Sequence, residues 1–290
     1  MDIDCFKAFL AVAKYQSFSL AAERLYITQP AVSKRILSLE SQLDVKLFDR
    51  INRQVRLTEA GTALLPKANS IIAALDEAKR TIHDLSGDVR GELHVATSHH
   101  VGLHKLPPML RQFSAHFPDV NLKFEFLDSE VAYQRVARGV CELAVVTISP
   151  FADKELEATP LWRDELSFVT SPSYEFDRSP SLTLLSELPA ILPDLNTFTG
   201  RIIKQCFDQQ QLPLTISMST NYLETIKMLC SVGLGWSVLP DSMIDHQLKR
   251  FSIDNVKLHR DLGVLHHPQR SLSNAAHAFF ELLLQDTIKT

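Results

Sequence analysis

The stretch that decides the fold is FSLAAERLYITQPAVSKRILSLESQLDVKLFDRINRQVRL, residues 18–57. It contains two short helical patterns separated by a turn, followed by a segment of strand character with a basic turn in it. In the second helical pattern, Val32, Ile36, Leu39 and Leu43 are spaced by four, three and four positions, which fixes one buried side. This order of elements predicts a winged helix-turn-helix.

The helix boundaries around this stretch follow from capping chemistry. Apolar residues at helical spacing predict a first helix near the start of the chain, with Ile3, Phe6, Leu10 and Ala13 as its stripe. Ser19 is expected to cap the second helix through its hydroxyl, and Thr28 the third. Pro30 then falls in the first turn of the third helix, where its missing N–H costs little.

The face of the third helix opposite its buried side has the chemistry to read a DNA groove. Gln29 can pair with adenine, Ser33 can reach bases or phosphates, and Lys34 can reach guanine or phosphate. Two predicted strands, 45–48 and 55–58, enclose a basic turn that would lie along the phosphate backbone. The predicted DNA contacts are Ser19, Thr28, Gln29, Pro30, Ser33, Lys34, Arg50, Arg53 and Arg56.

The segment closely resembles the N-terminal pattern of LysR-type transcriptional regulators. The residues that carry the resemblance are Phe9, Ser17–Phe18, Ala21–Ala22, Leu25, Gln29–Ser33, Ile36, Leu39–Glu40, Leu43, Leu47–Phe48, Arg50 and Leu57–Gly61. One departure is Asp44, where the family commonly has glycine. The alternative from the motif alone is a generic three-helix unit with a solvated basic hairpin, and the match through Gly61 removes it.

Charge and length agree with a DNA-binding head on a larger body. The 290-residue chain has a formal net charge of −4. The first 58 residues carry nine basic and six acidic side chains, a net +3, which leaves −7 for the remainder. With 45% hydrophobic residues, the chain is long enough for two or three domains with real cores. It is expected to be cytoplasmic, because neither a bilayer-length apolar run nor a leader is present.

Residues 59 to about 86 predict one long helix, assigned as a linker and dimerisation segment over 59–88. Its apolar positions alternate steps of four and three, which is a heptad seam. The seam consists of Leu64, Ala68, Ile71, Leu75, Ala78, Ile82 and Leu85. A helix of about 40 Å is too long for a small head to cover, so a partner helix is expected. The alternative is that the stripe packs on its own domain. In the resembled family this helix pairs between subunits.

Residues 89–290 predict an α/β effector-binding domain. Strands near 93–96, 120–126 and 143–147 alternate with helices near 102–115 and 130–138, which predicts a parallel sheet with covered faces. A second set has strands near 166–170, 190–192, 214–218 and 235–238, with helices near 199–210, 221–231 and 240–247. The chain then returns to the first set through Leu262–Leu265 and a helix near 272–287.

This arrangement resembles the LysR-type effector domain, which has two subdomains around a cleft and is similar to periplasmic binding proteins. The residues that carry this weaker resemblance include Leu106–Pro107, Phe117–Pro118, Gly139, Glu142–Leu143, Gly233–Gly235 and Leu239–Pro240. The fold class is therefore multidomain α + α/β. Subdomain I is assigned to about 91–161 and 266–290, and subdomain II to about 162–265.

A ligand in an open α/β sheet binds beyond the carboxyl ends of the strands, where helix N-termini supply free N–H groups. Hydroxyl, amide and imidazole groups at these ends would suit a small anion such as a carboxylate. The same residues are also ordinary helix caps. The predicted effector contacts are Thr97, Ser98, His99, His100, Ser129, Thr147, Thr197, Phe198, Thr220, Asn221 and His266.

Two further readings of this domain stay open. His99–His100 and His266–His267 follow strands that could be neighbours, so a metal site is conceivable, although no carboxylate or cysteine completes a set and no metal or cofactor is predicted. Cys206 and Cys230 could sense oxidants, as cysteine pairs do in some LysR-type relatives, whereas scattered cytosolic thiols are usually just buried.

The sequence thus predicts a DNA-binding transcriptional regulator controlled by a small, anionic effector. No nucleophile elbow, phosphate-binding glycine loop or H-E-x-x-H helix supports an enzyme. A cytosolic small-molecule-binding protein with a vestigial head is the other alternative. From the resemblance, the expected partners are promoter DNA, the effector, RNA polymerase and further copies of the chain, as a homodimer or homotetramer.

Overall fold

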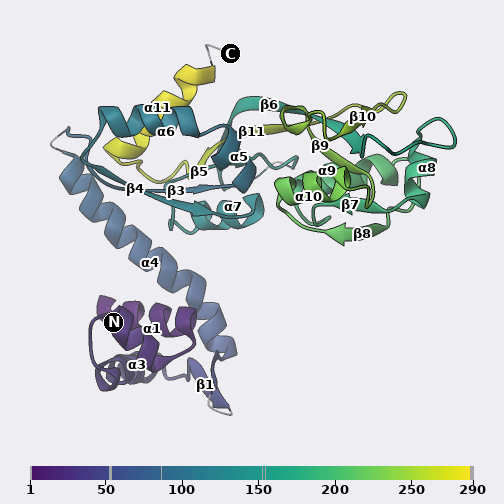
Figure 1. The fold of residues 1–290 in the computed structure, drawn as a ribbon. Coiled ribbons are helices and arrows are strands. Elements are labelled where there is room, and N and C mark those ends of the chain that lie inside the picture. The colour runs from purple at the N-terminus through teal and green to yellow at the C-terminus, as the bar shows by residue number, and fades with distance from the viewer. Residues whose placement is uncertain (1, 52–53, 86, 152, 154, 288–290) are drawn as a thin grey trace. The chain divides into compact units, whose positions relative to one another are not determined.

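The computed structural model describes residues 2–51, 54–85, 87–151, 153 and 155–287 (Figure 1). The chain divides into two compact units, Met1–Ser86 with Arg138–Val140, and Gly87–Ala137 with Cys141–Thr290. We call the first the head and the second the body. None of the helices described is both long enough and apolar enough to cross a membrane.

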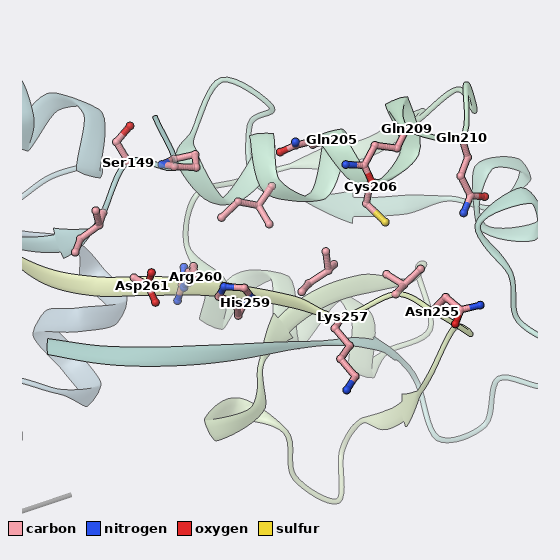
Figure 2. A pocket seen from close by; sticks show the side chains of 15 residues that line it. Ser149, Gln205, Cys206, Gln209, Gln210, Asn255, Lys257, His259, Arg260 and Asp261 are labelled. Carbon is pink, nitrogen blue, oxygen red and sulfur yellow. The ribbon is translucent and has the colours of Figure 1, made fainter. Parts of the chain in front are cut away.

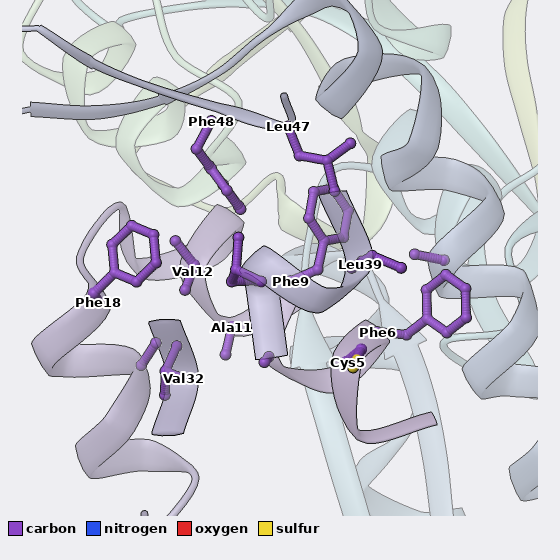
Figure 3. Close-up of a cluster of buried hydrophobic side chains, with 14 of the residues drawn as sticks. Cys5, Phe6, Phe9, Ala11, Val12, Phe18, Val32, Leu39, Leu47 and Phe48 are labelled. Atoms are coloured by element: carbon purple, nitrogen blue, oxygen red, sulfur yellow. The ribbon is translucent and has the colours of Figure 1, made fainter. Parts of the chain in front are cut away.

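The head begins with three helices and a two-stranded wing: α1 (Ile3–Tyr15), α2 (Phe18–Arg24), α3 (Gln29–Leu43), β1 (Phe48–Ile51) and β2 (Gln54–Leu57). Its core joins α1, α3 and the start of the wing, and includes Phe9, Val12, Leu39 and Phe48 (Figure 3). The predicted stripe of α3 is correct, since Val32, Ile36 and Leu39 are fully buried. The predicted stripe of α1 was only partly correct, because Phe6 is buried but most of the buried positions of the helix are others.

The buried positions of α1 are Cys5, Phe6, Ala8, Phe9, Ala11 and Val12. Ile3 is 37% exposed, and Leu10 and Ala13 are only partly buried.

The caps differ from prediction at one helix. Ser17, not Ser19, caps α2, and its hydroxyl accepts the Leu20 N–H at 3.2 Å. The helix starts earlier because Phe18 buries its ring against Phe48, with centroids 5.9 Å apart. Ser19 is exposed on α2. Thr28 caps α3 as predicted, accepting the Ala31 N–H at 3.4 Å, and Pro30 lies in the first turn.

The wing begins three residues later than the sequence predicted. Asp44 ends α3 in the left-handed region, at φ 52°, where the resembled family commonly has glycine. The segment after it is held against α3, because the carboxylate of Glu40 accepts the Leu47 N–H at 2.9 Å and the Lys46 ammonium at 2.8 Å. Residues 45–47 are therefore a connection, and pairing starts at Phe48↔Leu57.

The long helix α4 (Glu59–Asp84) is confirmed. It starts against the wing, where Thr58 accepts the Gly61 N–H at 3.0 Å and donates to the Lys46 carbonyl at 2.7 Å. Position 61 has no room for a side chain, since a Cβ there would lie 2.2 Å from the Leu47 carbonyl oxygen. Leu64 and Ala68 pack into the head core, so this part of the predicted seam is covered by its own domain.

The body's first subdomain contains β3 (Gly91–Thr97), α5 (His99–His104), α6 (Pro107–His116), β4 (Val120–Phe126), α7 (Ser129–Ala137) and β5 (Leu143–Thr147). β3 lies between β4 and β5 and is parallel to both. The single helix predicted over 102–115 is two helices, since α5 ends before Leu106 and Pro107 starts α6. The final helix, α11 (Asn274–Thr287), packs on this subdomain.

The second subdomain contains α8 (Leu182–Glu187), β7 (Ala190–Leu192), α9 (Phe198–Asp208), β8 (Ile216–Ser219), α10 (Leu223–Ser231), β9 (Ser237–Pro240), a 3₁₀ turn (Asp241–Met243) and β10 (Lys249–Phe251). The helix predicted over 240–247 was wrong. Only that 3₁₀ turn forms, because β10 then pairs antiparallel with β6. β7 and β8 form a separate parallel pair.

Two long strands connect the subdomains: β6 (Glu157–Thr170) and β11 (Leu258–His266). They pair antiparallel along their length, and β11 is also antiparallel to β5. The sheet is therefore mixed, with the order β10-β6-β11-β5-β3-β4 and β9 on β6, so a purely parallel sheet was wrong. Leu262 and Val264 lie in the core of subdomain I, which means that the chain returns to it several residues before the predicted boundary at 266.

Candidate functional site: a recognition helix and an interdomain cleft

The exposed side of α3 carries the predicted groove-reading residues. Thr28, Gln29 and Lys34 are exposed and Ser33 is partly exposed. Gln29 donates to the Ser33 hydroxyl at 3.1 Å, so these side chains lie together at the start of the helix. Sequence reasoning missed Tyr26, which it assigned only to the turn. Its side chain is 96% exposed, and its backbone is left-handed at φ 54°.

The wing carries part of the basic charge that the sequence predicted for it. Arg56 on β2 is exposed, and its backbone pairs with Asp49. Arg50 lies on β1, opposite Val55. Arg53 lies outside the described residues. The head therefore has a polar helix face and a cationic strand, which is the layout of a protein that contacts base edges and phosphates.

In the body, the residues after the strand ends meet in a small cleft between the subdomains. Subdomain I contributes the ends of β3, β4 and β5, and subdomain II contributes the starts of α9 and α10 and one side chain of β11. Eight predicted effector residues line the cleft: Ser98, His99, His100, Ser129, Thr147, Thr197, Phe198 and Asn221. Asp128, Glu130, Pro193, Thr199, Leu223 and Arg260 complete the lining.

Three predicted effector residues lie elsewhere. Thr97 is fully buried behind the cleft, and its hydroxyl donates to the Val145 carbonyl at 2.8 Å. Thr220 caps the turn that follows it, accepting the Tyr222 N–H at 3.3 Å. His266 lies 3.8 Å from Glu157 and packs on Phe280. It lies away from the cleft because β11 runs antiparallel to β5, which places His266 beside the start of β5 rather than beside Thr147 at its end.

Polar contacts between the subdomains hold the cleft nearly shut. Asn221 donates to the Asp128 carboxylate at 2.8 Å, and the Phe198 N–H donates to Glu130. His104 on α5 lies 2.9 Å from Glu224 on α10. The remaining volume is about 50 Å³, far below the several hundred Å³ of ordinary ligand pockets. A metabolite therefore requires the subdomains to separate.

A buried ionic network, which sequence reasoning missed, forms the floor of the cleft. Arg260 and Asp164 lie opposite each other on β11 and β6 and are about 5% exposed. Arg260 donates to Asp164 at 2.8 and 3.0 Å and to the Thr199 hydroxyl at 3.0 Å. Burial would raise the pKa of Asp164, but His100 and Arg260 outweigh it and the pKa lies below its usual value.

Glu130 is the acidic group at the mouth of α9. Its carboxylate accepts the first N–H of that helix, the position where an anion is favoured by free N–H groups and the helix dipole. Burial raises its pKa, and the hydrogen bond from Phe198 and the charge of Arg201 only partly offset this. Glu130 thus occupies the anion position of the cleft with a carboxylate of the chain itself.

A larger groove of about 450 Å³ lies along α9 and the approach to β11, with Gln205, Cys206, Gln209 and Lys257 on its walls (Figure 2). Its lining is mostly neutral, and apart from Arg260 it contains none of the charged groups of the cleft. We regard the cleft as the candidate effector site, because there the strand ends and two helix N-termini converge.

The redox hypothesis gains no support from the thiols. Burial raises the pKa of Cys206 and raises that of Cys230 to about 12, which disfavours the reactive thiolate. The two residues belong to different core clusters.

A winged helix-turn-helix head with an exposed polar face, joined to a body with a cleft between two α/β subdomains, defines a DNA-binding regulator with an effector-binding domain. Family models agree over nearly the whole chain. Residues 3–62 match a model described as "Bacterial regulatory helix-turn-helix protein, lysR family", and residues 86–287 match the "LysR substrate binding domain". The chain belongs to the LysR family of transcriptional regulators.

Two curated relatives illustrate the range of similarity. The chain is 32% identical to a probable RuBisCO transcriptional regulator of Trichormus variabilis, over 97% of this chain and 87% of that protein. It is 60% identical to an uncharacterized HTH-type transcriptional regulator of Azotobacter vinelandii, over 37% of this chain and 75% of that protein.

Solved structures share the fold. A full-length OxyR variant from Pseudomonas aeruginosa has a TM-score of 0.70 at 21% identity and covers 100% of this chain and 95% of its own. Full-length CbnR complexed with its target DNA has a TM-score of 0.67 at 20% identity, covering 99% and 100%. The effector-binding domain of QuiR with shikimate has a TM-score of 0.61 at 19% identity, covering 69% and 98%.

Proposed function

We propose that this chain is a sequence-specific regulator of transcription in the cytoplasm, with α3 in the major groove of its operator. Gln29, Ser33 and Lys34 read base edges and adjacent phosphates, while Arg50, Arg53 and Arg56 contact the flanking backbone. The observation that carries the proposal is the exposed polar face at the start of α3, backed by a fully buried apolar face. CbnR, whose fold is similar, was solved on its target DNA.

The test is a footprint and gel-shift series with the promoter beside the gene. Replacing Gln29 with Ala should cost about 1–3 kcal/mol at one base position. Lys34→Ala should also reduce the slope of binding against salt if it contacts phosphate. Gln42→Ala, exposed at the far end of α3, is the matched control. Equal losses for Gln42 and Gln29 would mean that the recognition face is misplaced.

We propose that α4 pairs with the same helix of a second chain, which matches a two-fold operator. Beyond the head core, Ile71, Ala78, Ile82 and Leu85 are exposed, and Leu75 is half-buried. Leu64 and Ala68 are left out of this interface because the head covers them. We also propose that four chains assemble into a tetramer through their bodies and that the protein contacts RNA polymerase, as is usual for the family.

Sedimentation tests the helix pairing. Ile82→Glu should weaken the dimer by at least about tenfold, because a charge would be buried in the seam. Thr81→Glu, on the neighbouring exposed face, should not. A wild-type chain that sediments as a monomer at micromolar concentration would refute the pairing.

We propose that a small anionic metabolite controls the protein by binding in the cleft. The N-termini of α9 and α10, with Ser98, His99 and Asn221, provide donors for a carboxylate. Because only about 50 Å³ is free, the effector must replace the contacts from Glu130 to Phe198 and from Asp128 to Asn221. Binding would then select a more open body. QuiR, whose fold is similar, holds shikimate, a carboxylate.

A thermal-shift screen of metabolic carboxylates tests this, followed by calorimetry of the hits. Ser98→Ala and Asn221→Ala should each weaken the binding of a true effector by about tenfold. Gln205→Ala, in the larger groove of Figure 2, should leave it unchanged. The opposite pattern would move the effector to that groove. Ligand binding without any salt-dependent binding of DNA would instead favour a small-molecule-binding protein with a vestigial head.

A further inference from the structure

Three potential metal ligands come together at the edge of the cleft. His100 and His104 lie on α5, and Glu224 lies on α10. One ligand atom from each lies within 4.8 Å of the others. Within the part of the chain that the structure describes, this is the one such cluster of histidine, cysteine and carboxylate groups. The histidine pairs considered from sequence do not form it, since neither His99 nor His266 takes part.

The spacing of the histidines supports a shared ligand. Residues four apart on a helix lie on the same face, and the rings of His100 and His104 are 4.8 Å apart between centroids. Two histidines at this spacing on a helix are a frequent half-site for zinc. This was the signal in the sequence that the search for adjacent pairs overlooked.

His100 has an unmet need for a partner. Its side chain is 4% exposed, and neither ring nitrogen has a hydrogen-bond partner among the described residues. Asp164 Oδ2 is 3.5 Å from Nε2. Burying an unpaired polar group costs free energy, and such groups are rare in folded proteins. A metal ion would supply a partner for one of these two nitrogens.

We propose that His100, His104 and Glu224 bind a divalent transition-metal ion of the zinc type, tying α5 of one subdomain to α10 of the other. Imidazole nitrogen and carboxylate oxygen suit zinc, and three protein ligands leave a fourth position open. Tetrahedral ligands lie about 3.4 Å apart. His104 and Glu224 are already 2.9 Å apart, and both side chains are about 40% exposed, so they can adjust toward His100.

The test is calorimetric titration of the full-length, tag-free chain with ZnCl₂. One site per chain is expected, and His104→Gln and Glu224→Gln should each weaken it by at least about 100-fold. Both targets are partly exposed, so the variants should fold even if His100→Gln does not. His116→Gln, an exposed histidine outside the cluster, is the matched control. Co²⁺ adds a second readout, because its visible absorption reports imidazole coordination.

Two results would overturn the proposal. The first is a wild-type chain without a stoichiometric zinc site. The second is zinc affinity that survives both His104→Gln and Glu224→Gln, which would place the metal on other histidines and leave His104 and Glu224 as a simple ion pair. The titration needs neither DNA nor effector. A chain that binds no zinc would therefore leave the proposed regulatory function unaffected, and a chain that binds no operator DNA would leave the proposed zinc site unaffected.

Discussion

The wing junction and the effector cleft each contain a glutamate that accepts a backbone N–H, yet their pKa values move in opposite directions. At the wing, Glu40 is buried, but the hydrogen bonds from Lys46 and Leu47 outweigh that burial and lower its pKa. In the cleft, burial raises the pKa of Glu130, and the hydrogen bond from Phe198 and the charge of Arg201 offset this only in part. The first carboxylate is matched to its site and stabilises the head. The second is poorly compensated, which is the condition of a group that a ligand can replace.

This comparison extends to the two units. The head presents its recognition face fully formed, whereas the body closes its cleft with its own side chains. Tryptophan fluorescence distinguishes the body from the head in an experiment, because the chain's two tryptophans, Trp162 and Trp236, both lie in the body. Tryptophan fluorescence therefore follows the body, and helical circular dichroism follows both units.

The largest expected effect is in the cleft floor. Arg260→Met would leave Asp164 buried without its guanidinium partner, which should destabilise the body by about 3–5 kcal/mol. Arg163→Met, in the exposed pair with Glu165, should cost less than about 1 kcal/mol. Urea denaturation followed by tryptophan fluorescence measures both. Similar losses for the two variants would show that the network is solvated.

In the head, Gly61→Ala should cost about 3 kcal/mol. The added methyl would lie 2.2 Å from the Leu47 carbonyl, so α4 would have to move away from the wing junction. The loss should appear in circular dichroism but not in tryptophan fluorescence. Ala63→Ser, exposed on the same helix, is the control, and an unchanged transition for Gly61→Ala would contradict the close approach.

Glu40→Gln should destabilise the head by about 2 kcal/mol at pH 7, since it weakens two charge-assisted hydrogen bonds. Because the folded pKa of Glu40 is lowered, its contribution is complete above the unfolded value of 4.5 and is lost as pH falls through the folded pKa. Wild type and variant should therefore converge in acid. Glu23→Gln, exposed on α2, should show no such convergence.

Glu130→Gln should have a smaller effect of opposite sign, stabilising the body by less than about 1 kcal/mol at neutral pH. The folded pKa of Glu130 is raised, so its ionisation costs stability above that pKa, and the cost disappears as pH falls toward 4.5. Removal of this charge should also tighten binding of an anionic effector in calorimetry. Weaker binding would mean that Glu130 is a ligand for the effector rather than its substitute.

The smallest expected effect is at the end of α3. Asp44→Gly should stabilise the head by about 0.5 kcal/mol, because glycine adopts the left-handed backbone without strain. Gln16→Gly, at the corresponding position of α1 with φ 50°, should give the same sign. Thermal denaturation followed by circular dichroism measures both, and destabilisation by each would show that the side chains matter more than the backbone.

Local sequence patterns predicted most helices and strands well. The parts that they missed depend on pairing between strands that are far apart in the sequence. β4, β5 and β7 begin and end where predicted, since each is a short run bounded by turn residues. The first half of β6 was missed because Arg163, Asp164 and Glu165 look like exposed loop residues. Only the register that puts Arg260 opposite Asp164 makes them a buried pair.

The candidate site divides in the same way. The exposed polar face of α3 followed from helix periodicity, and eight residues of the cleft lining followed from strand ends. Arg260, Asp164 and Glu224 could not be found by that rule, because Asp164 and Arg260 lie within strands and Glu224 lies within a helix, not at the end of a strand. They reach the cleft through β6, β11 and α10, elements whose position depends on how the two subdomains fold together.

The length of α4 has a mechanical consequence. Its 26 residues form a rod of about 39 Å. If one end of such a rod is fixed, a tilt of only about 5° displaces the other by about 3.4 Å, the rise of one base pair of DNA. A change of a few degrees at one end of this helix is thus enough to move a group at its other end by the height of one base pair.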